Sequence, residues 1–318
     1  MCGVFGNRLW LKGFDGRPII LLQNLNQSCL RLGNHKVIGN RYRLSAVCIV
    51  LSFQIATMAC NENTTPPQLE SFVYSKANAQ CPSGSRPGLA GATDGKVSVE
   101  GIKYMVRTPA NYQATFAHPL LMVYAPAGMS CWASERFTGL TTTATGAGFV
   151  VVYADHKQLN VSTVEQLGKI PELVAKEWCI DEKRVYATGH SDGGTASLAL
   201  AVLDKTKTIP AAIAPSAAGW TGKDLEEFQC PAPIPVMIMH GKNDTLFPGW
   251  GAQTSAWWAK CHGCDVSKTK MVEGGCRVYQ GCASSGATVY CEGSGGHRDW
   301  PNLNRVMLEF FAHPEKFL

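Results

Sequence analysis

Arg184-Val-Tyr-Ala-Thr-Gly-His-Ser-Asp-Gly-Gly194 is the stretch of sequence that decides the fold. It contains the pattern G-x-S-x-G at residues 189–193, after an apolar run at 185–188 and before a run of small residues at 195–203. This order predicts a nucleophile elbow, in which Ser191 lies on a sharp turn between a buried strand and a helix. The flanking glycines are required because a side chain at either place would collide with the neighbouring backbone. The pattern alone is common, and the strand and helix around it make it informative.

A serine hydroxyl becomes a good nucleophile only when a base takes its proton and a third group orients that base. The run 235–240 predicts a buried strand, and Asp244 follows its end at the edge of the sheet where the elbow lies. His297 follows the glycine-rich stretch 293–296, which can approach the elbow. We therefore expect Ser191 as nucleophile, Asp244 as the acid and His297 as the base, in the chain order of α/β-hydrolases. The alternative for Asp244 is a turn-forming residue.

Other acidic residues and histidines fit these roles less well. Asp265 and Asp299 do not directly follow a core strand, so they are weaker candidates for the acid. His190 and His240 are expected to pack or hydrogen-bond around the elbow. His156 follows another strand end and is predicted either to line the pocket or to be a satisfied loop histidine.

Acyl transfer also needs backbone N–H groups that stabilise the developing oxyanion. One is expected from Asp192, directly after the nucleophile. The second should come from the loop after the predicted strand at 120–125, and since Pro126 has no N–H, Ala127 or Gly128 is the expected donor.

The substrate pocket is expected to include Trp300 and Trp220 besides His156, with core packing as the alternative for the tryptophans. Only about twenty residues separate the strands on either side of residues 215–234, where a lid is commonly inserted. We therefore predict no large lid and an open site, which suits a bulky or polymeric ester.

The distribution of apolar runs predicts the fold class. Strands alternate with helices, which indicates an α/β fold with a mostly parallel central sheet and helices on both faces. The expected strands lie at 97–106, 119–125, 149–153, 185–188, 211–214, 235–240, 277–279 and 288–291. The expected helices lie at 164–178, 195–203, 251–261 and 303–312. We divide the chain into a leader at 1–60, a linker and irregular segment at 61–95, and a catalytic domain at 96–318.

The leader has the pattern of a secretory signal. Two arginines at 41 and 43 precede 16 residues without a charge, 44–59, which is short for a membrane span of roughly 20 residues. Cys60 follows, as at a lipoprotein cleavage site, so lipid anchoring through Cys60, plain export and an uncleaved anchor all remain open. The forty residues before this run suggest a misassigned start, with synthesis beginning near Val37 or Leu44. The protein is expected to be secreted, periplasmic or lipid-anchored at the cell envelope.

Charge and cysteine content agree with export. The net charge of +5 comes from the leader, because residues 61–318 hold 22 basic and 23 acidic residues, so no nucleic-acid partner is indicated. Nine cysteines follow Cys60, which suits disulfides in an oxidising compartment and leaves one free or paired with Cys60. The alternative is a zinc site at Cys261-x-x-Cys264 with Cys276 and Cys282. We expect no metal and no cofactor.

From about residue 95 to its end, the chain resembles the secreted polyhydroxybutyrate-depolymerase and feruloyl-esterase branch of the α/β-hydrolases. The segments that carry the resemblance are 108–112, 179–194, 240–248, 258–265 and 295–301. It implies the same Ser191, Asp244 and His297, and a disulfide between Cys264 and Cys282. Members cleave hydroxyalkanoate oligomers, feruloylated or acetylated plant polysaccharides, or small soluble esters. We therefore expect a serine esterase acting on a small or polymeric ester. An inactive surface-binding module and a peptidase of the prolyl-oligopeptidase type remain alternatives.

Overall fold

The computed structural model describes residues 8–12, 18–22, 80–282 and 286–318. The expected signal sequence, Cys60 and most of the expected linker lie outside these residues. Within the expected leader at residues 1–60, the strands β1 (Arg8–Lys12) and β2 (Pro18–Leu22) form an antiparallel pair.

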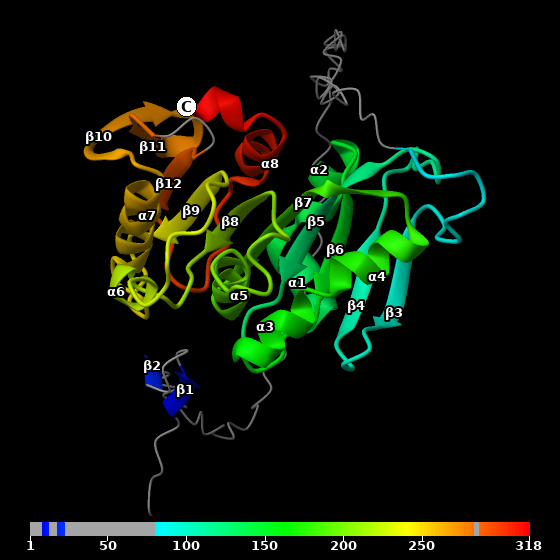
Figure 1. Cartoon of the computed structure of the whole chain (residues 1–318), viewed down its shortest axis with the longest axis horizontal. Helices are drawn as coiled ribbons and strands as arrows, with labels where there is room; N and C mark the ends of the chain where they lie inside the picture. Colours follow the sequence, from blue (N-terminus) through cyan, green and yellow to red (C-terminus); the bar gives the residue numbers. More distant parts are fainter. Residues whose placement is uncertain (1–7, 13–17, 23–79, 283–285) are drawn as a thin grey trace, which may run out of the picture.

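A single large sheet of ten strands organises the rest of the described chain (Figure 1). Its strands are β3 (Ala92–Val97), β4 (Lys103–Arg107), β5 (His118–Tyr124), β6 (Val150–Ala154), β7 (Ile180–His190), β8 (Ala212–Ser216), β9 (Val236–Gly241), β10 (Asp265–Val272), β11 (Cys276–Gln280) and β12 (Thr288–Gly293). The order across the sheet is β10-β11-β12-β9-β8-β7-β5-β6-β4-β3. The six strands from β12 to β6 are parallel, and the strands outside them pair antiparallel. The predicted mostly parallel sheet is therefore confirmed.

Several details differ from the sequence-based expectations, among them the helices at residues 131–138 and 140–146, which were not expected. Strand β10 was not expected, and its side chains are mostly exposed, so it lacks the apolar pattern that marks a buried strand. The expected domain boundary at residue 96 falls inside β3, which pairs with β4 and so belongs to the sheet.

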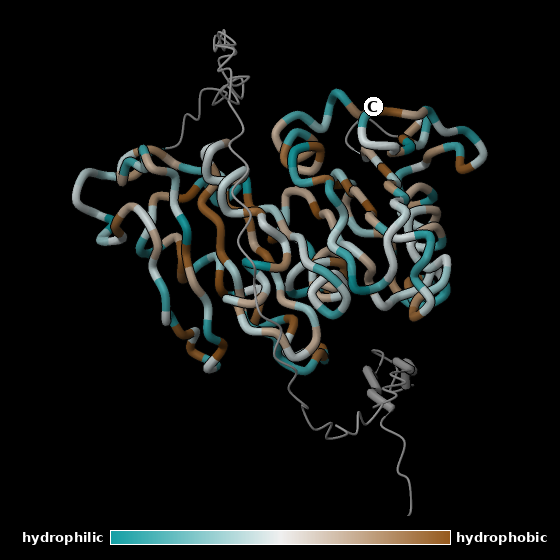
Figure 2. Tube along the Cα trace, turned by 180° about the vertical axis from the view of Figure 1, so that it is seen from behind, coloured by the Kyte–Doolittle hydropathy of each residue, from teal (hydrophilic) through white to brown (hydrophobic). Residues whose placement is uncertain are grey.

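Helices cover both faces of the sheet. They are α1 (Cys131–Thr138), α2 (Leu140–Gly146), α3 (Val161–Leu167), α4 (Ile170–Glu177), α5 (Asp192–Leu200), α6 (Gly222–Leu225), α7 (Trp250–Cys261) and α8 (Asn304–Ala312), with 3-10 turns η1 (Glu273–Gly275) and η2 (Pro314–Phe317). Alternate residues of β5 enter two separate cores: Leu120 and Met122 pack with α3, α4, α5 and α7, whereas Leu121 and Val123 pack with α1, α2 and α8. Figure 2 shows hydrophobic residues along the central strands and hydrophilic residues in many of the outer turns.

Eight of the nine cysteines after Cys60 form disulfides. The pairs are Cys81–Cys179, Cys230–Cys261, Cys264–Cys282 and Cys276–Cys291, and Cys131 is free and buried. The disulfide implied by the family resemblance is thus present, the odd cysteine is Cys131, and the cysteines of the alternative zinc site are all in disulfides. Four disulfides in one domain are typical of an oxidising compartment.

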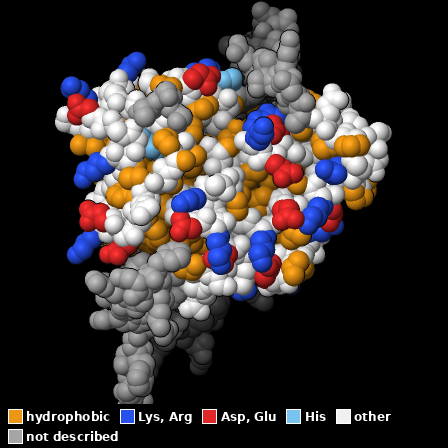
Figure 3. Space-filling view, viewed as in Figure 1, with side chains coloured by type: hydrophobic (Ala, Val, Ile, Leu, Met, Phe, Trp, Pro, Cys, Tyr) orange, Lys and Arg blue, Asp and Glu red, His pale blue; other side chains and the backbone are white. Residues whose placement is uncertain are grey.

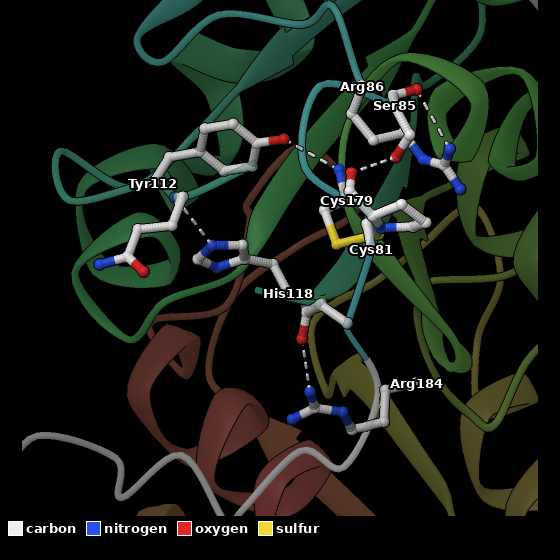
Figure 4. Close-up of a disulfide and its surroundings, with 10 residues drawn as sticks. Cys81, Ser85, Arg86, Tyr112, His118, Cys179 and Arg184 are labelled. Atoms are coloured by element: carbon white, nitrogen blue, oxygen red, sulfur yellow. Dashed lines mark hydrogen bonds between the residues drawn. A yellow bond between two sulfur atoms is a disulfide. The ribbon is translucent and has the colours of Figure 1, made fainter. Parts of the chain in front are cut away.

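The Cys81–Cys179 disulfide fixes the segment that leads to the elbow strand (Figure 4). The backbone N–H of Cys179 donates to the Tyr112 hydroxyl at 2.8 Å, and the Arg184 guanidinium donates to the backbone oxygen of Ala117 at 2.9 Å. These contacts hold the start of β7 beside β5.

Three further observations concern the segment between β8 and β9, the charges on the surface, and the length and hydropathy of the helices. Between β8 and β9 the chain forms only the short helix α6, in agreement with the prediction of no large lid. Figure 3 shows basic and acidic side chains interspersed over the face in view. In the described part of the chain, none of the helices has both the length and the apolar character to cross a membrane.

Candidate active site

The turn between β7 and α5 has the geometry of a nucleophile elbow. Ser191 has φ 55° and ψ −117°, a conformation that is strained for a residue with a side chain. A Cβ atom on Gly193 would lie 1.9 Å from the backbone oxygen of Tyr124, and one on Gly189 would lie 2.5 Å from the backbone of Gly193. The expected need for glycine at both positions is therefore confirmed.

Three side chains from separate parts of the chain meet at the carboxyl edge of the sheet. Asp244 follows β9, and His297 follows β12, which is parallel to β9. His297 Nε2 lies 2.9 Å from Ser191 Oγ, and His297 Nδ1 lies 2.8 Å from Asp244 Oδ2. The structure therefore brings together the three residues that the sequence nominated.

Asp244 is held as a carboxylate. Its side chain is buried, and Oδ1 accepts hydrogen bonds from the backbone N–H groups of Leu246 at 2.9 Å and Phe247 at 2.8 Å. Burial would raise the pKa of Asp244, but the hydrogen bonds from His297 and Phe247 outweigh it and lower the pKa below its ordinary value. Asp244 also has the turn-forming role that was the alternative prediction for it. One oxygen of its carboxylate accepts the two hydrogen bonds of the turn, and the other contacts His297.

The partners of His297 fix its tautomer. A carboxylate can only accept, so Nδ1 carries the hydrogen and Nε2 is free to accept the Ser191 hydroxyl. The imidazole is also packed between rings, with the Phe247 ring edge-on at 4.6 Å and the His190 ring at 5.5 Å. This arrangement lets Nε2 take a proton from the serine while the carboxylate stabilises the imidazolium.

The two histidines beside the elbow make hydrogen bonds, as expected. His190 Nδ1 lies 3.0 Å from Ser216 Oγ, and its Nε2 lies 2.6 Å from the backbone oxygen of His297. Burial lowers the pKa of His190 to about 4. His240 Nε2 donates to the backbone oxygen of Phe247 at 2.9 Å, and burial lowers its pKa as well.

The expected oxyanion donors lie on two neighbouring segments. Asp192 is the first residue of α5, so its N–H has no acceptor within the helix. Ala127 and Gly128 are exposed and form the turn closed by the hydrogen bond from Met129 N to Pro126 O. Because Tyr124 of β5 pairs with Gly189 of β7, this turn begins at the level of the elbow.

His156 and the two tryptophans of the expected pocket have different surroundings. His156 Nε2 lies 3.0 Å from Asp192 Oδ2, and its backbone N–H donates to Met129 O, so it links the elbow to the turn after β5. Trp300 is partly exposed and lines a cavity of about 340 Å³ beside His190. Trp220 is only 2% exposed and packs against Phe228, which corrects the expectation that it is accessible to substrate. Within the described residues, no group of three or more His, Cys, Asp and Glu side chains could hold a metal ion.

Comparison with known proteins agrees with this architecture. No protein-family profile matches the chain. Feruloyl esterase B of Piromyces equi is 26% identical over 227 residues, covering 61% of this chain and 42% of that protein. Feruloyl esterase D of Neurospora crassa is 26% identical over 244 residues, covering 66% of this chain and 81% of that protein. The chain therefore spans less than half the length of the first of these relatives.

A solved structure shows the shared fold. The acetyl xylan esterase from Aspergillus awamori aligns with a TM-score of 0.54 at 15% sequence identity, covering 70% of this chain and 99% of that chain. Its likeness, together with the mostly parallel sheet and the helices on both faces, shows the α/β-hydrolase fold. The chain therefore has the α/β-hydrolase fold and is similar in sequence to feruloyl esterases.

Proposed function

We propose that the protein is a serine esterase that hydrolyses carboxylic esters through an acyl-enzyme. The observation that carries this proposal is the continuous hydrogen-bonded path from Ser191 Oγ through His297 to the Asp244 carboxylate, at 2.9 and 2.8 Å. It lies on a strained elbow, at the place where α/β-hydrolases keep their nucleophile.

In the proposed reaction, His297 Nε2 takes the hydroxyl proton as Ser191 Oγ attacks the ester carbonyl. The N–H of Asp192 and the N–H of Ala127 or Gly128 stabilise the oxyanion of the tetrahedral intermediate. The intermediate expels the alcohol, which receives the proton from His297, and Ser191 remains acylated. Water then attacks the acyl group with His297 as base, which releases the carboxylic acid and restores the serine. No step of this path needs a metal or a cofactor.

The proposed substrates are esters of plant polysaccharides that carry feruloyl or acetyl groups. The similarity to feruloyl esterases and the absence of a large lid between β8 and β9 support this class. The four disulfides support export to an oxidising compartment, with the predicted signal sequence before residue 60 as the means. Residues 96–318 are proposed as the catalytic domain, together with the rest of strand β3, which pairs with β4.

The test compares wild type and Ser191→Ala on p-nitrophenyl acetate and butyrate. We expect turnover by the wild type and a loss of at least roughly 10³-fold in kcat for the variant. Equal turnover by both proteins would overturn the mechanism, and no turnover by either would favour the inactive binding module. A parallel assay with methyl ferulate, acetylated xylan and hydroxybutyrate oligomers then assigns the substrate class.

A further inference from the structure

The variable position of the elbow pattern, residue 190, holds a buried histidine with two defined partners. The imidazole is 3% exposed, and its nitrogens face Ser216 Oγ and the backbone oxygen of His297. A carbonyl oxygen can only accept, so Nε2 carries the hydrogen and Nδ1 accepts from the Ser216 hydroxyl. One neutral tautomer of His190 therefore satisfies both contacts.

The loop that carries His297 has little packing on one side. The cavity of about 340 Å³ is lined by residues 293–296 of this loop and by His190. Three of these four loop residues are glycines, whose backbones can take many conformations. Lys242 and Asn243 donate backbone hydrogen bonds to residues 293 and 295, whereas the bond from His190 reaches the backbone of residue 297 itself.

We propose that His190 is a positioning residue that holds the backbone of His297, so that its imidazole stays in line between Ser191 Oγ and Asp244 Oδ2. This inference rests on the proposed function, in which His297 is the base. A hydrogen bond at the carbonyl of residue 297 opposes rotation of the preceding glycines and movement of the loop into the cavity. A displacement of about 1 Å at a reacting group can lower the rate by about 100-fold.

A neutral side chain suits this place. The titratable groups that face His190 are His297, Asp244 and His240. When His297 takes the serine proton, a positive charge forms on a ring whose centroid is 5.5 Å from that of His190. A second positive charge at His190 would repel the charge on His297 and so destabilise it. Burial lowers the pKa of His190 to about 4, so its ring stays neutral.

The experiment measures kcat and KM for p-nitrophenyl butyrate in wild type, His190→Ala and His190→Gln. We expect His190→Ala to lower kcat roughly 10- to 100-fold with little change in KM, because the alignment of His297 is lost. His190→Gln should recover part of kcat, because its amide can still donate to the backbone of residue 297.

His262 provides the matched control. It is 1% exposed, its pKa is also lowered by burial to about 4, and its Nδ1 lies 2.7 Å from Thr288 Oγ1, away from the elbow. His262→Gln should therefore lower the melting temperature while keeping kcat. If His190→Ala folds poorly, His190→Leu takes its place, and a wild-type kcat in that variant overturns the proposal.

A double-mutant cycle separates a positioning role from a general structural one. In the His297→Ala background, His190→Ala should change the residual rate by less than about twofold, since its effect passes through His297. An equal loss in both backgrounds contradicts the proposal. Ser191→Ala separates failure of the proposed function from failure of the positioning role. Full activity in Ser191→Ala refutes the proposed function. An inactive Ser191→Ala together with a normal kcat in His190→Ala refutes only the positioning role.

Discussion

The Asp244→Asn substitution replaces one carboxylate oxygen with an amide nitrogen at the centre of the site. The carboxylate now makes two kinds of contact: Oδ1 accepts from two backbone N–H groups, and Oδ2 accepts from His297 Nδ1. The amide oxygen of asparagine must take the place of Oδ1, because only an acceptor satisfies the two N–H groups. The amide NH2 then faces His297 and donates to it.

This forces the wrong tautomer on His297. Its Nδ1 must accept, so the hydrogen moves to Nε2, which lies 2.9 Å from Ser191 Oγ. Nε2 can then no longer take the serine proton, and we expect kcat to fall by about 10⁴-fold. Loss of the charge weakens the turn hydrogen bonds by about 1 kcal/mol, which corresponds to a fall in Tm of only ~2–4 °C.

The assay is p-nitrophenyl butyrate hydrolysis at pH 7.5, with thermal unfolding measured on the same samples. Asp265→Asn is the control, because the Asp265 side chain is 40% exposed and interacts with Ser267 and Lys268 on β10. We expect its kcat to match the wild type. A kcat of Asp244→Asn within about tenfold of the wild type, in a protein that melts normally, would refute the tautomer argument.

Three further outcomes follow from the described contacts. Gly193→Ala should abolish activity or soluble expression, because the added Cβ would lie 1.9 Å from the backbone oxygen of Tyr124. Gly146→Ala should be tolerated, because a Cβ at residue 146 has no neighbour within 4 Å. A normal kcat in Gly193→Ala would contradict the prediction. Replacing both Cys81 and Cys179 by alanine removes a disulfide that links residues 98 positions apart. The free energy of unfolding, measured in urea, should fall by about 2–5 kcal/mol. An unchanged urea midpoint would contradict this prediction. The unfolding free energy should decrease as pH falls from 6.5 to 4, because His190 and His262 stay neutral in the folded protein but become protonated in the unfolded chain. Each histidine contributes a decrease of up to about 1.4 kcal/mol per pH unit. His262→Gln should make this pH dependence shallower, and equal slopes in the variant and the wild type would contradict the prediction.

The fold could be predicted because its central strands are continuous apolar runs. Strands β5 and β6 are buried along their full length, so the sequence that forms them has no polar face. The three site residues could also be nominated, because Asp244 and His297 each follow such a strand. Strand β10 could not be predicted, since its exposed side chains give no pattern.

Contacts between distant segments remained beyond sequence reasoning. The Cys276–Cys291 disulfide joins residues that face each other across β11 and β12, and this pairing is defined only once the register is known. His190 donates a hydrogen bond to the backbone oxygen of His297, 107 residues away in the sequence. Every residue has a backbone oxygen, so the sequence pattern does not indicate which one accepts this bond. The burial of Trp220 likewise depends on its packing against Phe228.

Covalent labelling of the activated hydroxyl tests the central claim most directly. A p-nitrophenyl phosphonate ester phosphonylates an activated serine and releases nitrophenolate, and mass spectrometry of the digested protein locates the adduct. We predict stoichiometric release, complete loss of esterase activity and a single adduct on Ser191, with labelling strongly slowed in His297→Ala. Complete inactivation with the adduct on another residue, or continued ester hydrolysis by a protein fully labelled at Ser191, would contradict the account.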